Sequence, residues 1–414
     1  MTLSFFDKPI KNDYFTLMYR AELCKYCKRI GVQTNDIDDL MTVQNAIVLT
    51  LGENLTPEVI VRIKENNNFL VVFDINDNSV LTHTYGAFDE VLLIDLIFKI
   101  AGIQTTQESY EMHIDHELNY TRRKKRFQEG AWGKYFDMVA ANKVRSLPYP
   151  PWDLTTVDIV PWEERNKLAL IRGGHHYQRV HLFLHLLSLG MLDESSLFPA
   201  REYAFQFCED CKNIFKKSDF QDGKVTFERL KKYPNISCRL KNWKYDFNVN
   251  CGLWNNSCVS RYYDLAELFR NKYGGFELSA VERAFSGAFT NNSWRNKILN
   301  RYLLFADFKW IFSIYAPPRF WEGAEACTVN LVPERTNDQE FFPEIQEDVH
   351  YITYKEDFSN LEEACGVDQE KFEFITNNCF ELYNTWIARQ DDYRVSPNLL
   401  QHILDEIEQA HGSL

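Results

Sequence analysis

The feature that most constrains the fold of this chain is a set of short, continuous apolar runs that alternate with longer amphipathic segments. Residues 45–51 (NAIVLTL) and 69–75 (FLVVFDI) are rich in β-branched and aromatic residues, which is typical of strands buried on both faces. Between them, Thr56 and Pro57 open a helical segment that extends to Glu65, because threonine caps a helix start and proline suits its first turn. Strands that alternate with helices predict a parallel sheet with helices on both faces, which is an α/β fold.

A second series of alternating elements follows a proline-rich stretch at 147–152 (LPYPPW), which we interpret as a linker. Residues 167–174 (KLALIRGG) predict a strand that leads into a glycine pair, and a helix that ends at Gly190 follows. Residues 302–306 and 351–354 predict two further strands. A chain of 414 residues is long for one hydrophobic core, so we expect the second series to form a second α/β domain.

Three other regions complete the predicted elements. Residues 14–31 predict a helix that stops at a glycine, and the chain ends in two helical segments, 369–389 and 397–410. Residues 89–103 (DEVLLIDLIFKIAGI) fit either a third strand at 90–95 or a single helix, and both alternatives stay open.

The composition excludes several classes of function. The net charge of −13 argues against general nucleic-acid binding, which depends on the release of counterions by lysine and arginine. We see no secretory signal and no run of 18 apolar residues, so we expect a cytoplasmic protein without a transmembrane segment. Of the ten cysteines, Cys208 and Cys211 form a CxxC pair, which is a weak zinc signal. Buried free thiols are the preferred interpretation, and a zinc site there stays open.

A helix followed by a buried strand is the most informative unit for function. A double proline enters a helix at 319–327, and residues 328–332 predict the strand. The first turn of a helix carries free N–H groups and a partial positive charge, so it can hold a diphosphate or a polarised sugar oxygen. Arg319 and Glu322 share one face near that end, with a guanidinium suited to phosphate and a carboxylate suited to hydroxyls. An ordinary helix–strand unit with surface charges is the alternative.

The sequence of this unit, RFWEGAEACTVNLVPE at 319–334, resembles the donor-site segment of GT-B glycosyltransferases, and EFFPEIQEDVHYITYKEDFSNLEE at 340–363 resembles its continuation. The likeness is greatest to the group-1-like, spore-maturation branch, with CAP10-type and fucosyltransferase-type enzymes as looser relatives, and it covers roughly 165–390. It implies two Rossmann-like domains that face each other across a cleft, with a C-terminal helix that crosses back. The expected parts are an acceptor domain (1–150), a donor domain (151–390) and the returning helix (391–414).

The resemblance implies transfer of a hexosyl or pentosyl unit from a nucleotide-diphosphate sugar to a hydroxyl of a glycan, lipid-linked or protein acceptor. Such a transfer needs the departing diphosphate to be stabilised, and the chain offers basic residues and a strand–Gly–Gly–helix junction for this purpose. The expected donor-binding residues are Arg172, Gly173, Gly174, Arg179, Lys297, Arg301, Arg319, Glu322 and Glu325.

The catalytic assignment is more open. Ile314 stands where retaining group-1-like enzymes carry a glutamate, and Thr328 stands where the family usually has a glycine, so retention and inversion both stay open. An inverting enzyme needs a base from the first domain. The candidates are Asp74, His83, Asp95 and Asp115.

No Asp-x-Asp motif follows a strand, and we therefore expect no essential divalent metal and no cofactor besides the sugar donor. Two alternatives remain, which are a catalytically inactive GT-B-like binding or scaffold protein and a nucleotide-sugar epimerase of related fold. The sequence is also compatible with weak self-association.

Overall fold

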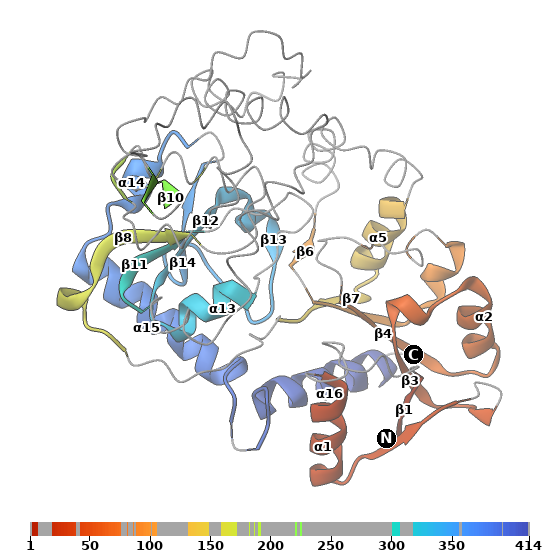
Figure 1. Cartoon of the computed structure of the whole chain (residues 1–414). Coiled ribbons are helices and arrows are strands. Elements are labelled where there is room, and N and C mark those ends of the chain that lie inside the picture. Colours follow the sequence, from red (N-terminus) through yellow and green to blue (C-terminus); the bar gives the residue numbers. More distant parts are fainter. Residues whose placement is uncertain are drawn as a thin grey trace, which may run out of the picture.

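The computed structural model shows a mixed α/β chain with two larger parallel sheets (Figure 1). The residues that it describes are 2–6, 19–38, 42–75, 81, 86, 88–100, 102–105, 131–148, 159–171, 182, 186, 189–191, 220–221, 224–225, 300–306, 318–355, 358–390 and 392–412.

The first sheet has six strands in the order β2-β1-β3-β4-β5-β7, and every neighbouring pair is parallel. Its strands are β1 (Thr2–Phe5), β2 (Gln33–Asp36), β3 (Ile47–Leu51), β4 (Phe69–Asp74), β5 (Leu96–Lys99) and β7 (Val144–Ser146). The strands predicted at 45–51 and 69–75 are confirmed as β3 and β4. The sequence analysis missed β1, β2 and β7, which have only three or four residues each and therefore little periodic signal.

Both alternatives for residues 89–103 are wrong. The segment forms a 3-10 helix, η5 (Asp89–Leu93), and then β5 and the two-residue strand β6 (Ile103–Gln104). Leu92 and Leu93 are more than 40% exposed, so the first half of the apolar run does not enter the sheet. Asp95 separates the two parts, because its carboxylate accepts a hydrogen bond from the Leu70 N–H at 2.7 Å.

Helices cover both faces of the first sheet. On one face α1 (Ala21–Ile30) and α16 (Pro397–Gly412) pack on side chains such as Leu49, Val71 and Phe98. On the other face lie α2 (Pro57–Glu65), α5 (Ala131–Ala140) and η5, above the alternate residues of the same strands. The start of α2 is as predicted, since the Thr56 side chain accepts a hydrogen bond from the Val59 N–H.

The second sheet has four parallel strands in the order β14-β12-β11-β8. The strands are β8 (Asn166–Ile171), β11 (Tyr302–Ala306), β12 (Val329–Pro333) and β14 (Tyr351–Tyr354), and the helices that pack around them include α13 (Pro318–Glu325), α14 (Leu361–Cys365) and α15 (Gln369–Trp386). The strands predicted at 302–306 and 351–354 are confirmed. Gly190 has a φ of +71°, and the Met191 N–H donates to the Leu186 carbonyl oxygen at 2.9 Å, which agrees with the predicted helix end there.

The remaining described elements are short. They are the 3-10 helices η3 (Gly52–Asn54), η6 (Trp162–Glu164) and η10 (Glu334–Asp338), an antiparallel pair of β9 (Phe220–Gln221) and β10 (Lys224–Val225), and β13 (Gln339–Glu340). Within the described ranges, no helix combines the length and the apolar character needed to cross a membrane.

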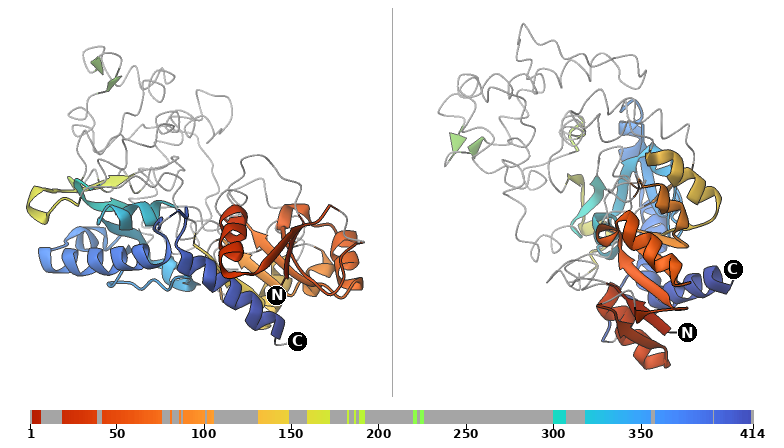
Figure 2. Two further views of the ribbon diagram at one scale, coloured as in Figure 1. Left: turned by 90° about the horizontal axis from the view of Figure 1, so that it is seen from below. Right: turned by 90° about the vertical axis from the view of Figure 1, so that its right-hand side faces the viewer.

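Two features tie the sheets together. Strand β6 of the first half pairs antiparallel with β13 of the second half, with Gln104 opposite Gln339 and Ile103 opposite Glu340. Helix α16 follows α15 of the second half and runs back against the first sheet, as Figure 2 shows from below. Its residues Leu400 and Ile403 belong to the core of that sheet.

Candidate functional site

The carboxyl edges of the two sheets are connected by the β6–β13 ribbon. Strand β6 begins four residues after the carboxyl end of β5, and β13 follows the carboxyl end of β12 after η10. The antiparallel pair between them therefore ties the carboxyl edge of one sheet to that of the other (Figure 1). Gly102 permits this junction, because a Cβ atom there would lie 2.3 Å from Gln339 Oε1. In open parallel sheets this is the edge at which ligands bind.

Helix α13 begins at the carboxyl edge of the second sheet. It leads directly into β12, so it runs antiparallel to that strand and its first turn lies near the end of the strand. Phe320, Trp321 and Ala324 are buried against α15 and β14. Gly323 faces the sheet closely, since a Cβ atom there would lie 2.3 Å from Asn330 Oδ1. The predicted helix and strand boundaries of this unit agree with the structure within two residues.

The end of α13 explains the unusual residue at the expected glycine position. The residue with left-handed backbone is Cys327, with a φ of +50°, and not Thr328. The Thr328 N–H donates to the Gly323 carbonyl oxygen at 2.9 Å and closes the helix. A threonine at position 328 therefore needs no glycine-like conformation.

The first turn of α13 offers backbone donors. Pro318 has no N–H, and the N–H groups of Arg319, Phe320 and Trp321 have no carbonyl partner one turn earlier within the helix. They point toward the carboxyl edge, together with the positive end of the helix dipole. The side chain of Arg319 lies outside the part that the structure describes.

The two glutamates of α13 differ in their surroundings. Glu325 is only 8% exposed and accepts a hydrogen bond from the Tyr383 hydroxyl of α15. Burial raises the pKa of Tyr383, and the carboxylates of Glu325 and, less strongly, Glu322 raise it further. Glu322 is half-buried and keeps part of its side chain in contact with solvent. Glu325 is thus enclosed between two helices, whereas Glu322 is the more exposed of the two glutamates although its Oε2 atom is buried.

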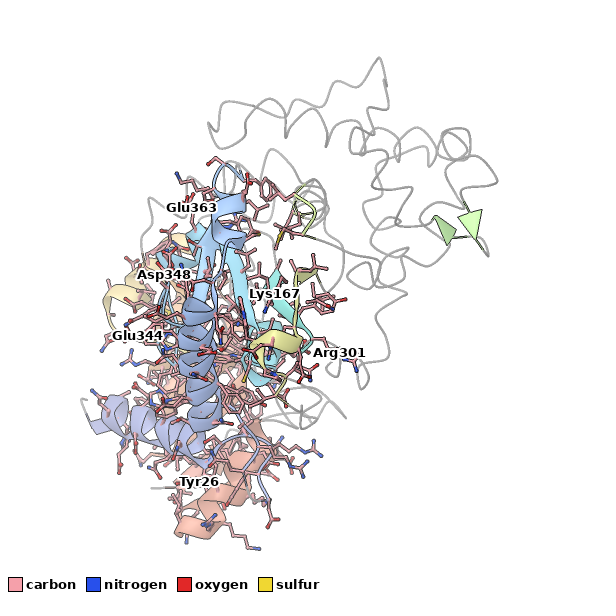
Figure 3. All side chains as sticks on the ribbon, turned by 90° about the vertical axis from the view of Figure 1, so that its left-hand side faces the viewer. Tyr26, Lys167, Arg301, Glu344, Asp348 and Glu363 are labelled. Carbon is pink, nitrogen blue, oxygen red and sulfur yellow. The ribbon has the colours of Figure 1, made fainter. Side chains whose placement is uncertain are left out.

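Arg301 lies at the opposite edge from α13's first turn. It immediately precedes β11, so it occupies the amino edge of the second sheet, where its carbonyl oxygen accepts the Asn166 N–H at 2.8 Å. Its side chain is exposed and projects outward in Figure 3. The other predicted basic and glycine residues, Arg172, Gly173, Gly174, Arg179 and Lys297, and the base candidates His83 and Asp115 lie outside the described residues. Arg172 comes directly after the last residue of β8, so the chain leaves that strand at the carboxyl edge.

Asp74 is the last residue of β4 and lies at the carboxyl edge of the first sheet, as expected. It is opposite Lys99 of β5, with 3.1 Å between Lys99 Nζ and Asp74 Oδ1, and both side chains are 0% exposed. Tyr135 of α5 is also fully buried beside them. Burial raises the pKa of Tyr135, the backbone of Gln104 lowers it, and the carboxylates of Asp74 and Glu340 add to the rise. The Asp74 carboxylate is therefore closed off by an ion pair.

Asp95 lies at the amino edge of the first sheet. It precedes β5 and forms an ion pair with Lys64 at 2.6 Å, besides its bond to the Leu70 N–H. These two contacts hold the residue that precedes β5 against α2 and β4. The structure consequently places Asp74 and Asp95 at opposite edges and does not bring them together.

The sequence analysis missed two groups of residues near these edges. Lys99 was hidden in an apolar run, although a lysine at the end of one buried strand and an aspartate at the end of the preceding one are a recognisable signal for a buried pair. The second group is a network beside β14. Tyr351 donates to Asn337 at 2.7 Å, and the Asn337 amide donates to Glu347 at 2.5 Å. Thr353 also donates to Glu347. Only the tertiary structure joins these residues.

The residues that the structure describes contain no group of three or more His, Cys, Asp or Glu side chains placed to hold a metal ion. Cys208 and Cys211 lie outside these residues.

Comparison with known protein families and with curated proteins gives no match. Two solved structures show a likeness over nearly the whole chain. HepE from Anabaena, in complex with UDP and glucose, is 9% identical with a TM-score of 0.39, and the match covers 99% of this chain and 100% of that one. A trehalose-6-phosphate synthase, studied with bisubstrate glycomimetics for glycosyl transfer with retention, is 12% identical with a TM-score of 0.37, over 99% and 93% of the two chains. At these identities and TM-scores, the likeness assigns neither a family nor a function to this chain.

Proposed function

We propose that this protein is a glycosyltransferase that moves a sugar from a nucleotide-diphosphate sugar to a hydroxyl group of an acceptor. The observation that carries the proposal is the position of α13. The helix whose sequence resembles a donor-site segment begins at the carboxyl edge of one parallel sheet, and the β6–β13 ribbon ties that edge to the corresponding edge of the other sheet. Two ligand-binding edges held near one another suit a reaction that must bring two substrates together.

The donor diphosphate is proposed to bind at the carboxyl edge of the second sheet. The free N–H groups at the start of α13 and the positive end of its dipole stabilise negative charge, which grows on the diphosphate as the glycosidic bond breaks. Arg319 belongs to this turn, and Arg172, Gly173 and Gly174, which follow β8 directly in the sequence, are predicted to take part. Arg179 and Lys297 stay predicted members of this site.

Carboxylates near the same edge are proposed to read sugar hydroxyls. Glu322 is half-buried with its Oε2 atom buried, and Glu347 is held beside β14 by Asn337 and Thr353. Ionised carboxylates accept strong hydrogen bonds from hydroxyl groups. Glu325 is not part of this proposal, because it is enclosed against Tyr383. Arg301 is also left out, because it lies at the amino edge.

The acceptor is proposed to bind at the carboxyl edge of the first sheet. Asp74 is closed off by Lys99 there, so we assign it the role of organising the edge and not that of a base. Asp95 lies at the other edge, so His83 remains the predicted general base. The proposed acceptor and donor domains span 1–150 and 151–390, with α16 returning to the first. The proposal assigns no role to a metal ion.

Saturation-transfer NMR with UDP-, GDP-, CMP- and dTDP-sugars tests the donor site. We expect signals from at least one nucleotide sugar in the wild-type chain, and we expect Arg319→Ala to weaken them strongly. Arg301→Ala is the matched control, because it removes an arginine from the amino edge and should leave binding unchanged. The proposal is rejected if no nucleotide sugar binds the folded protein, or if the two variants behave alike. Product analysis then separates transfer, which releases free nucleotide, from epimerisation, which leaves the sugar on its nucleotide.

A further inference from the structure

The ribbon of β6 and β13 joins the two sheets through very few residues. Each strand has two residues, and the paired positions are Gln104 with Gln339 and Ile103 with Glu340 (Figure 1). Two short strands on their own are at best marginally stable in water, because they share few hydrogen bonds and little apolar surface. The stability of this ribbon therefore depends on the side chains that it encloses.

Gln339 is an unfavourable side chain to enclose in this ribbon. The residue is only 8% exposed, and its Oε1 and Nε2 atoms are buried without a hydrogen-bond partner within the described part of the chain. A carboxamide carries both donor and acceptor groups, and none of them is used here. A buried polar group that is left unsatisfied lowers the stability of the arrangement that buries it. Gln104 on the opposite strand differs, because its Nε2 donates to the Asp338 carbonyl oxygen at 3.5 Å.

The pairing of the two strands encloses this carboxamide. A Cβ atom at Gly102 would lie 2.3 Å from Gln339 Oε1 and 2.5 Å from Phe341 Cε1, so the carboxamide and the ring both lie against the backbone just before β6. When β6 and β13 separate, Gln339 leaves this backbone and its carboxamide becomes accessible to water. The unfavourable burial therefore acts on the paired state alone, and it favours opening of the ribbon.

A second connection keeps the two halves of the chain together when the ribbon opens. Helix α16 packs in the core of the first sheet through Leu400 and Ile403. At the start of α16, the Ser396 hydroxyl and the Asn398 amide both donate to the Thr385 carbonyl oxygen of α15, at 2.7 and 3.1 Å. These contacts do not involve the ribbon, so its opening does not require the two halves to come apart.

We propose that the β6–β13 ribbon is a releasable clasp, which unpairs locally and frees the two carboxyl edges from each other while α16 holds the halves together. The unsatisfied Gln339 carboxamide shifts the equilibrium toward opening. Ligands bind at these edges in parallel sheets, so the clasp controls access to them. This opening needs no sugar donor, and it occurs whether or not the protein is a transferase.

Hydrogen–deuterium exchange of the full-length chain, read by mass spectrometry, tests the clasp. Peptides that cover β6 and β13 should exchange faster than peptides that cover β5 and β12 while the protein as a whole stays folded. Gln339→Leu removes the carboxamide at similar size, and the loss of one unsatisfied buried group changes an opening constant by about 5- to 150-fold. We therefore expect exchange in the ribbon to slow by at least about fivefold. Gln104→Leu is the matched control and should not slow exchange, because the Gln104 carboxamide already has an acceptor.

Three results would overturn the clasp: the ribbon of the wild-type chain is protected as well as β5 and β12, Gln339→Leu exchanges at least as fast as wild type, or the two leucine variants slow exchange equally. The last result would show that added apolar surface, and not the lost carboxamide, closes the ribbon. Gln339→Met replaces Gln339→Leu if urea denaturation shows that the latter is unfolded. Exchange is measured without a nucleotide sugar, so these outcomes do not depend on the donor-binding test.

Discussion

Replacing Gly323 by alanine tests how α13 is placed against the second sheet. A Cβ atom at Gly323 would lie 2.3 Å from Asn330 Oδ1, 3.0 Å from Asn330 Cγ and 3.1 Å from Phe305 Cδ1. Asn330 cannot easily move aside, because it is 2% exposed and its amide donates to the Phe320 carbonyl oxygen at 3.1 Å. The added methyl group therefore has to push the helix outward or break this hydrogen bond.

The expected magnitude follows from three terms. Overpacking a closed site costs ~1–3 kcal/mol. Loss of the hydrogen bond between Asn330 and Phe320 costs about 1 kcal/mol more. Alanine gains about 1 kcal/mol over glycine in a helix interior. The sum predicts that Gly323→Ala lowers the free energy of unfolding by about 1–3 kcal/mol, and the displaced first turn of α13 should raise KM for the sugar donor.

Urea denaturation of Gly323→Ala, Asn330→Ala and the double variant measures this effect. Removing the Asn330 carboxamide takes away the obstacle, so the double variant should be more stable than the sum of the single effects predicts. Gly412→Ala is the control, because no heavy atom lies within 4 Å of a Cβ atom there. A stability of Gly323→Ala equal to that of wild type, or strictly additive effects, would refute the packing described for α13.

Three further predictions concern charged groups. Glu322→Gln should lower kcat/KM for the donor by about 10- to 100-fold, as expected for a lost hydrogen bond to a charged group. Glu325→Gln should leave kcat/KM nearly unchanged and should destabilise the fold by ~1–3 kcal/mol. Equal kinetic losses in the two variants would contradict the different exposure of the two side chains. Asp74→Asn should lower the free energy of unfolding by ~3–5 kcal/mol, because it leaves Lys99 as a buried unpaired charge. Combining it with Lys99→Met should recover most of that loss. An Asp74→Asn variant as stable as wild type would show that the pair is not buried. Burial holds the pKa of His402 below its ordinary value of about 6.5, so its neutral form stabilises the fold above that pH and the contribution is lost as the pH falls toward the lower pKa of the folded state. Denaturation midpoints between pH 7 and 5 should therefore fall less steeply in His402→Phe than in wild type, and parallel curves would exclude this role.

Several elements were predictable because their signals are local. Strands β3, β4, β11 and β14 are continuous apolar runs, and α2 begins at a threonine–proline pair that caps it in the structure as well. Such signals act within one turn or one strand, so they can be recognised without knowing which other segment the element packs against. The segment at 89–103 shows where this reasoning stops. Its apolar run extends through Leu93, but the bonds of Asp95 to Lys64 and Leu70 decide where the strand begins.

In the candidate site too, local sequence predicts some features and the tertiary structure decides others. Local sequence alone placed a helix start at Arg319 and a carboxylate at Glu322, because spacing along a helix is set by the chain itself. Whether a neighbouring glutamate faces solvent or a tyrosine is decided by α15, which lies more than 40 residues further along the chain.

The edge of a sheet to which a residue belongs also depends on strand register. Asp74 and Asp95 are similar in sequence context, yet they lie at opposite edges and each is neutralised by a lysine from another element. The sequence by itself thus determined elements with strong local signals, namely α2, β3, β4, β11 and β14, through apolar periodicity and capping. Only the tertiary structure decided which side chains remain accessible, because burial and ion pairing depend on residues brought together from distant parts of the chain.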